Sequence, residues 1–219
     1  MTKQVVIFGV KDTAQLADYY LKRDTDYEVV AFTVSHTQIP KGAMFCGKPV
    51  VPWEEVELAY TPNRYKLFIP MTGRQMNKIR RALYLEGKYK GYQYISYISP
   101  HATVCDNEIG ENCFILEDNT LQPFTKIGNN VVLWSGNHIG HHGVIRDHVF
   151  FTSQVTLSGH CDVGEYSWFG VNSTINDQIK IAEGTFVASG ALITKDTTQW
   201  RGYMGVPAKE VKDSLEMNP

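Results

Sequence analysis

The stretch LWSGNHIGHHGVIRDHVFFTSQVTLSGHCDV (residues 133–163) decides the fold, because a large apolar side chain stands at every sixth position. The same spacing runs unbroken from Ile109 to Ile193. Since 43% of the chain is apolar, fifteen consecutive matches arise by chance roughly three times in a million per starting point. A period of six is typical of the hexapeptide repeats of a parallel β-helix and fits neither an α-helix nor simple strand alternation. The positions are Ile109, Ile115, Leu121, Ile127, Leu133, Ile139, Ile145, Phe151, Leu157, Val163, Phe169, Ile175, Ile181, Val187 and Ile193.

Three hexapeptides should form one triangular coil of 18 residues, so that residues 18 apart stack at the inter-strand spacing of about 4.8 Å. The large apolar residue of each repeat should point into this prism. The residue four positions later is mostly small or β-branched and should fit near a corner. We therefore expect an all-β prism over residues 96–219, with a short cap at its C-terminal end.

An α/β pattern precedes the prism over residues 1–95. Apolar runs at 3–9, 27–34 and 64–70 alternate with helical patterns, the second of which covers about 76–88. Such alternation predicts a small, Rossmann-like parallel α/β domain. Its first strand-to-helix turn, Gly9 to Ala14, lies where these domains bind nucleotide phosphates, although a plain turn also needs glycine there.

Basic residues in this domain suggest a phosphate ligand. Lys11 lies in the glycine turn, and the segment Asn77–Arg81 places cations at the start of a helix, where they oppose the helix dipole. A nucleotide diphosphate would compensate them. A solvated basic face is an equally consistent interpretation.

The composition excludes several classes of function. A net charge of −2 gives no nucleic-acid or anionic-membrane surface. The sequence has neither an 18-residue apolar run nor a secretory signal pattern, so we expect a cytoplasmic protein without membrane insertion. The four cysteines form no CxxC pair, and we interpret them as reduced thiols; they are Cys46, Cys105, Cys113 and Cys161.

Histidines gather at one predicted corner of the prism. In the hexapeptide register His141 and His142 follow Ile139, His142 stacks on His160, and His141 stacks on Gly159. The missing side chain of Gly159 leaves space and backbone N–H groups beside His141. Histidine exchanges protons near neutral pH, so His141 is a candidate general base.

Two other interpretations of these histidines stay open. Surface turns tolerate histidine freely. Three of the four residues His138, His141, His142 and His160 could instead bind zinc, as in prism-shaped carbonic anhydrases, which needs ligands that converge at 2.0–2.1 Å. We expect one chain to bring them together poorly, whereas ligands could assemble across subunits.

Several motifs along most of the chain resemble one family. They are the glycine turn at Phe8–Ala14, MNKIR at 76–80, YISPHATV at 97–104, the repeat IGHHGV and GVPAK at 205–209. With them the chain resembles the two-domain hexapeptide-repeat sugar acyltransferases, that is, the sialic-acid O-acetyltransferase-like family with its nucleotide-amino-sugar N-acetyltransferases of bacterial glycan and O-antigen (lipopolysaccharide) synthesis.

The resemblance implies a left-handed β-helix, a homotrimer, and acyl-CoA bound in the groove between neighbouring prisms. It implies N-acetylation of a nucleotide-linked amino sugar from acetyl-CoA, without a metal cofactor; sugar O-acetylation is the alternative. Taking residues and resemblance together, we expect His141, His142 and Asn137 to be catalytic. The expected acyl-CoA contacts are Gly159, Val171, Ser189 and Lys209, and the expected sugar-nucleotide contacts are Gly9, Lys11, Asp12, Thr33, Asn77, Lys78 and His138.

The first prediction concerns assembly. The prism faces carry few charges between Val132 and Ser158, and a lone prism would expose them to water. We expect light scattering at micromolar concentration to give the mass of a trimer. A monomeric mass would contradict both the trimer and a groove shared between subunits.

Overall fold

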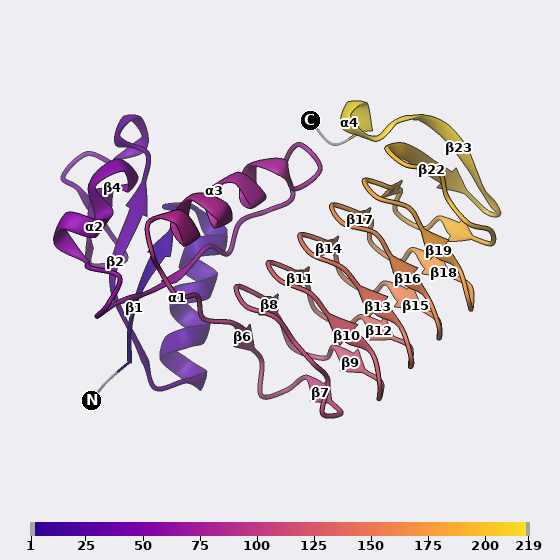
Figure 1. Ribbon diagram of the computed structural model, residues 1–219, viewed down its shortest axis with the longest axis horizontal. Helices are drawn as coiled ribbons and strands as arrows, with labels where there is room; N and C mark the ends of the chain where they lie inside the picture. Colours follow the sequence, from indigo (N-terminus) through magenta and orange to yellow (C-terminus); the bar gives the residue numbers. More distant parts are fainter. Residues whose placement is uncertain (1–2, 218–219) are drawn as a thin grey trace. The chain divides into compact units, whose positions relative to one another are not determined.

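A computed structural model describes residues 3–217 of the chain, which divides into two compact units (Figure 1). The first unit runs up to Thr72 and includes Ala82–Ser96, while the second contains Gly73–Arg81 and begins again at Tyr97. The segment 73–81 therefore belongs with the prism, a departure from the boundary expected after residue 95. Among the residues described, no helix has the length and apolar character needed to cross a membrane.

The first unit has a five-stranded sheet in the order β3-β4-β2-β1-β5. Strands β1, β2, β4 and β5 are parallel, and only β3 runs antiparallel to its neighbour, so the predicted α/β class is confirmed. The strands are β1 (Lys3–Phe8), β2 (Tyr27–Val34), β3 (Met44–Phe45), β4 (Lys48–Pro52) and β5 (Lys66–Phe68). The helices are α1 (Asp12–Asp24), η1 (His36–Gln38), η2 (Trp53–Glu55), α2 (Val56–Ala59) and α3 (Lys78–Tyr89), whose first turn lies in the second unit.

The second unit is a left-handed parallel β-helix with three faces of stacked two-residue strands (Figure 1). One face contains β10 (Lys126–Ile127), β13 (Val144–Ile145), β16 (Asp162–Val163) and β19 (Lys180–Ile181). The next contains β6 (Tyr97–Ile98), β8 (Phe114–Ile115), β11 (Val132–Leu133), β14 (Phe150–Phe151), β17 (Trp168–Phe169) and β20 (Phe186–Val187). The third contains β7 (Thr103–Val104), β9 (Thr120–Leu121), β12 (His138–Ile139), β15 (Thr156–Leu157), β18 (Thr174–Ile175) and β21 (Leu192–Ile193). The chain ends in the hairpin β22 (Arg201–Gly205) and β23 (Ala208–Asp213) and helix α4 (Ser214–Met217).

The apolar positions of the repeat form the core of the prism, as predicted. From Ile115 to Ile193 every sixth residue is at most 4% exposed, and Ile109 is partly buried against them. Strand partners are 18 residues apart, as in the pairing of Leu133 with Phe151. Cys113 and Cys161 fill interior positions, whereas Cys46 is exposed and Cys105 half-buried; all four thiols are free.

The corners of the prism repeat a backbone conformation as well as a side-chain pattern. The third residue after each apolar position, from Ile109 through Val187, has a positive φ, with His142 at +55° and His160 at +56°. Asn, Asp, His and Gly are the residues that tolerate this left-handed region best, and they hold most of these positions. The two histidines therefore occupy equivalent corners of successive coils.

The segment 73–81 is held to the prism by buried polar side chains. Arg80 is fully buried, and its guanidinium donates to the carbonyl oxygens of His148 at 2.9 Å and Val149 at 3.2 Å. The Asn77 amide, also fully buried, donates to the carbonyl oxygen of Tyr166 at 2.9 Å. Buried charged donors are retained when carbonyl acceptors satisfy them, so this segment is an integral part of the second unit.

His148 closes a buried ladder of amides beside Arg80. The Asn112 amide donates to the Asn130 carbonyl oxygen at 2.7 Å, and the Asn130 amide donates to Nδ1 of His148 at 2.9 Å. Nδ1 must therefore keep its lone pair, which the neutral ring supplies. Burial and the charge of Arg80 lower the pKa of His148 to about 4.

This arrangement predicts a loss of stability in mild acid. The unfolded chain binds a proton at His148 near pH 6.5, the folded chain only near pH 4, so the contribution is present above pH 6.5 and is lost as the pH falls towards 4. We expect a decrease of about 3 kcal/mol in the free energy of unfolding across this window, measured by denaturant titration at one protein concentration.

The variant His148→Asn tests this assignment, because asparagine extends the Asn112–Asn130 ladder and accepts the positive φ of +66°. Its stability should vary less between pH 6.5 and 4 than that of the parent. The exposed His101→Asn is the matched control and should keep the parental slope. An unchanged slope in His148→Asn would show that other groups cause the acid sensitivity.

Candidate active site

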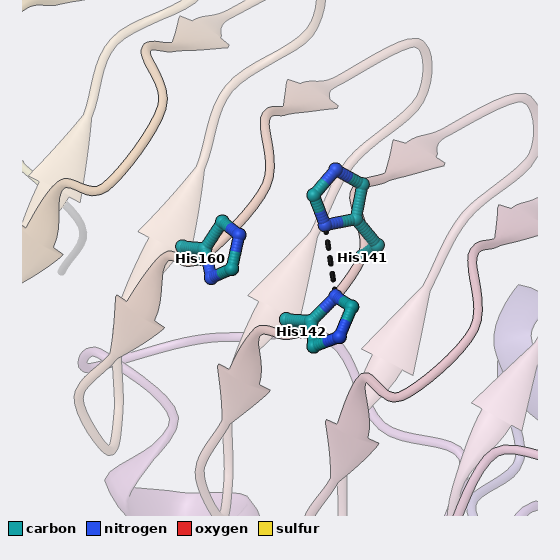
Figure 2. A group of neighbouring side chains, drawn as sticks. All are labelled: His141, His142 and His160. Carbon is teal, nitrogen blue, oxygen red and sulfur yellow. Dashed lines mark hydrogen bonds between the residues drawn. The ribbon is translucent and has the colours of Figure 1, made fainter.

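Three histidine side chains meet at one corner of the prism. His141, His142 and His160 are all exposed, and one ring nitrogen from each lies within 4.8 Å of the other two (Figure 2). The rings of His142 and His160 stack at 5.1 Å with an interplanar angle of 18°. The predicted stacking of residues 18 apart is thus observed. The expectation that one chain brings the histidines together poorly is wrong, because His160 from the next coil replaces the more distant His138.

His141 is oriented by two hydrogen bonds. Its Nδ1 lies 3.0 Å from Nδ1 of His142, so one ring donates to the other (Figure 2). Its backbone N–H donates to the side-chain oxygen of Gln122 at 3.1 Å. When the Nδ1 proton is on His141, its Nε2 carries the lone pair. His142 can therefore fix the tautomer that makes His141 a base.

Gly159 leaves space on the other side of the His141 ring. A Cβ atom at Gly159 would lie 2.8 Å from Cε1 and 3.1 Å from Nε2 of His141. The same point is 3.1 Å from Oδ1 of Asp177. Within the part of the chain that is described, the Gly159 N–H meets no hydrogen-bond acceptor, while its carbonyl accepts from the N–H of Gln178 at 2.9 Å. A bound group thus finds an open backbone donor next to a basic nitrogen.

Asp177 is a functional candidate that the sequence interpretation missed. It lies 18 residues beyond Gly159 and 36 beyond His141, at the same position in the register. Its Oδ1 shares the space above Gly159 with Nε2 of His141, and its Oδ2 accepts from Gln178 at 2.8 Å. A carboxylate there would stabilise a protonated His141 ring.

Asn137 is wrong as a catalytic residue. It is 1% exposed, its Nδ2 donates to Oδ1 of Asn119 at 2.9 Å, and its Oδ1 accepts from the N–H of Val155 at 2.8 Å. The side chain thus satisfies backbone and amide groups inside the prism. His138 lies on β12, half-buried, and is outside the group of three histidines.

The predicted acyl-CoA contacts occupy separate places on the second unit. Val171 and Ser189 are exposed and stack 18 residues apart at another corner of the prism, where the carbonyl oxygen of Val171 accepts from the N–H of Gly190 at 2.8 Å. Lys209 lies on β23 and lines a cavity of about 310 Å³ together with Lys195 and Tyr203.

The glycine turn of the first unit lies at the carboxyl end of β1. Gly9 has a φ of +122° and donates its N–H to the carbonyl oxygen of Thr33 at 2.9 Å. Lys11 forms the N-cap of α1 and is exposed, as is Asp12 in its first turn. Oriented N–H groups, an exposed cation and a helix start suit a phosphate.

Two residues predicted to contact the sugar nucleotide are wrong, because their side chains are buried and engaged. Thr33 is fully buried, and its hydroxyl donates to the carbonyl oxygen of Val51 at 3.0 Å. Asn77 is likewise buried and donates to prism carbonyl oxygens. Lys78 is exposed, but its ammonium group lies 4.3 Å from the ring centre of Trp200, a cation–π contact.

Glu54 is a second residue that the sequence gave no signal for. It follows β4, and its carboxylate accepts from the Ser35 hydroxyl and the His36 N–H, each at 3.0 Å. These hydrogen bonds hold the pKa of Glu54 below its ordinary value. A carboxylate thus lies at the carboxyl end of β2, where the sequence after that strand supplies none.

The site geometry predicts the effect of one methyl group at Gly159. Alanine fits the backbone there, since the φ of Gly159 lies outside the left-handed region, but its Cβ would collide with the His141 ring. We expect Gly159→Ala to leave the far-ultraviolet circular dichroism unchanged and to shift the ring ¹⁵N resonances of His141. Ser189→Ala, at another corner, is the control. Unchanged His141 resonances would mean that the ring does not occupy this position in solution.

Comparisons with known proteins agree with this geometry. The family model described as "Bacterial transferase hexapeptide (six repeats)" matches residues 108–141. An acyl-(acyl-carrier-protein)–UDP-N-acetylglucosamine O-acyltransferase from Helicobacter pylori is 33% identical over 95 residues, which are 40% of this chain and 35% of that protein. Serine acetyltransferase 4 from Arabidopsis thaliana is 33% identical over 109 residues, 45% of this chain and 31% of that protein. The matches span about a third of the length of these curated relatives.

Solved structures match both units. The acetyltransferase domain of PglB from Neisseria gonorrhoeae has a TM-score of 0.85 at 21% identity and covers 95% of this chain and 100% of that chain. A mutant perosamine N-acetyltransferase from Caulobacter crescentus, solved with CoA and GDP-perosamine, has a TM-score of 0.85 at 22% identity, with 97% and 99% covered. The chain therefore has the hexapeptide-repeat fold of these acetyltransferase structures, with an α/β unit in front of the prism.

Proposed function

We propose that this protein transfers an acetyl group from acetyl-CoA to the amino group of a nucleotide-linked amino sugar, with His141 as the general base. The observation that carries the proposal is the His141 ring, held at Nδ1 by His142 and bordered by the unpaired N–H of Gly159. A base next to an open backbone donor is the arrangement that acyl transfer requires. The CoA and GDP-perosamine bound in the Caulobacter crescentus protein support this substrate class.

The reaction would proceed by direct transfer. Nε2 of His141 takes a proton from the sugar amine, and the amine nitrogen attacks the thioester carbonyl carbon. The oxyanion that forms would accept a hydrogen bond from the Gly159 N–H, a contact worth about 3–4 kcal/mol for one such donor. When the C–S bond breaks, the CoA sulfur receives the proton from the His141 ring, and an amide remains on the sugar. Asp177 would stabilise the ring while it carries the positive charge.

The first unit would hold the nucleotide. The N-terminal end of α1, a helix of Asp12–Asp24, together with exposed Lys11 at its N-cap, offers positive charge and N–H donors to a diphosphate. Gly9 lets the backbone turn at this point, with its φ of +122°. Lys78, which contacts Trp200, and buried Asn77 are not part of this proposed phosphate site.

The same corner could acylate a sugar hydroxyl, which remains the alternative within this chemistry. An assay that follows free thiol release from acetyl-CoA with UDP-, GDP- and dTDP-linked amino sugars, and with the corresponding hydroxy sugars, separates the two. Thiol release with amino sugars alone supports N-acetylation. Release with hydroxy sugars alone would overturn it.

Substitutions at the two histidines test the assigned roles. We expect His141→Ala to lower kcat by about 10²–10⁴-fold, because it removes the base. His142→Ala should cost less, since His142 acts through its neighbour; His142→Gly separates this effect from backbone strain, because glycine adopts the φ of +55° freely. His101→Asn is the control. If His141→Ala keeps more than about a tenth of the parental kcat, the proton is removed elsewhere.

A further inference from the structure

The three corner histidines have the geometry of a transition-metal site. Two imidazole nitrogens bound to one tetrahedral zinc ion at 2.0–2.1 Å are about 3.3 Å apart. The Nδ1 atoms of His141 and His142 are 3.0 Å apart, so a small opening of the pair would admit an ion between them. The ring of His160 lies alongside with a nitrogen within 4.8 Å of both (Figure 2). All three side chains are exposed and can rotate onto a common ion.

The backbone presents these ligands from two successive coils. The His160 N–H donates to the carbonyl oxygen of His141 at 2.8 Å, which fixes the distance between the coils. His142 and His160 share the left-handed corner conformation, so their side chains leave the prism in the same direction. The ligand set therefore depends on the register of the prism and not on a mobile loop.

A carboxylate lies where a second ligand shell would need it. A metal-bound imidazole usually donates its other ring N–H to a carboxylate or a carbonyl group. Nε2 of His141 and Oδ1 of Asp177 each lie 3.1 Å from the same point above Gly159. With Nδ1 bound to the ion, Nε2 would carry the proton and face Asp177.

We propose that His141 and His142 through Nδ1, together with a ring nitrogen of His160, bind one divalent transition-metal ion such as Zn²⁺, and that this ion inhibits acyl transfer. Imidazole nitrogens suit zinc, copper, nickel and cobalt. Inhibition follows because the metal requires the lone pair on Nδ1 of His141 and leaves the proton on Nε2, whereas the base requires the reverse. Only this second part rests on the proposed function; metal binding by itself does not.

Metal binding can be measured without any substrate. The probe is Co²⁺ or Zn²⁺ added to full-length, tag-free protein that has been treated with a chelator. We expect one ion per chain, with the visible bands of four-coordinate Co²⁺ and a saturable heat of Zn²⁺ binding. His160→Asn, which accepts the corner φ of +56°, should weaken binding by at least about tenfold, while His101→Asn should bind like the parent. Absence of saturable binding, or equal affinity in His160→Asn, would overturn the site.

Inhibition is tested with the same variants and acetyl-CoA. Zn²⁺ should suppress thiol release by the parent and by His101→Asn, whereas His160→Asn should keep its activity at the same zinc concentration. Equal suppression of all three would overturn the inhibitory role. Metal binding without acyl transfer to any nucleotide sugar would refute the proposed function and leave the metal site standing. Hydration of CO₂ by the zinc-loaded protein would refute inhibition and support a zinc enzyme.

Discussion

The stacking of one aliphatic or aromatic side chain on the next, every 18 residues along the prism axis, is the interaction on which the second unit depends. Each buried side chain of this size contributes about 1.5–3 kcal/mol, and ordering the backbone of a hexapeptide costs a comparable amount. No coil is therefore stable without the coils beside it. From Ile115 to Ile193 the stack is uninterrupted, which explains why the period of six tolerates no break in the sequence.

This constraint also positions the chemistry. Because the interior fixes the register, a residue at a corner is aligned with those 18 positions before and after it, and its φ is set by the turn. The contacts of His142 with His160, and of His141 with Gly159 and Asp177, follow from this alignment alone. The site is thus as rigid as the core beneath it, a condition that favours precise placement of a base and a backbone donor.

The period of six made the prism, its register and the corner histidines predictable, and the same arithmetic carried one coil further would have revealed Asp177. It could not separate outward-facing polar residues from those that satisfy the interior. Asn137, Asn77 and Thr33 have the residue types of a binding site, yet each is buried and hydrogen-bonded to backbone or amide groups. The segment 73–81 was missed for a related reason: Arg80 and Asn77 attach it through carbonyl oxygens, which leave no periodic signal.

The partner of His141 gives this corner a choice that a carboxylate would remove. A carboxylate only accepts hydrogen bonds, so it would fix the proton on Nδ1 of the base. His142 can donate or accept at 3.0 Å, and therefore both tautomers of His141 are accessible. Asp177, on the Nε2 side, favours a proton on that nitrogen, whether the proton arrives from a substrate amine or is left there when Nδ1 binds a metal. Base catalysis and metal ligation thus compete for one imidazole, and the competition follows from placing a histidine where an acidic residue would allow only the first.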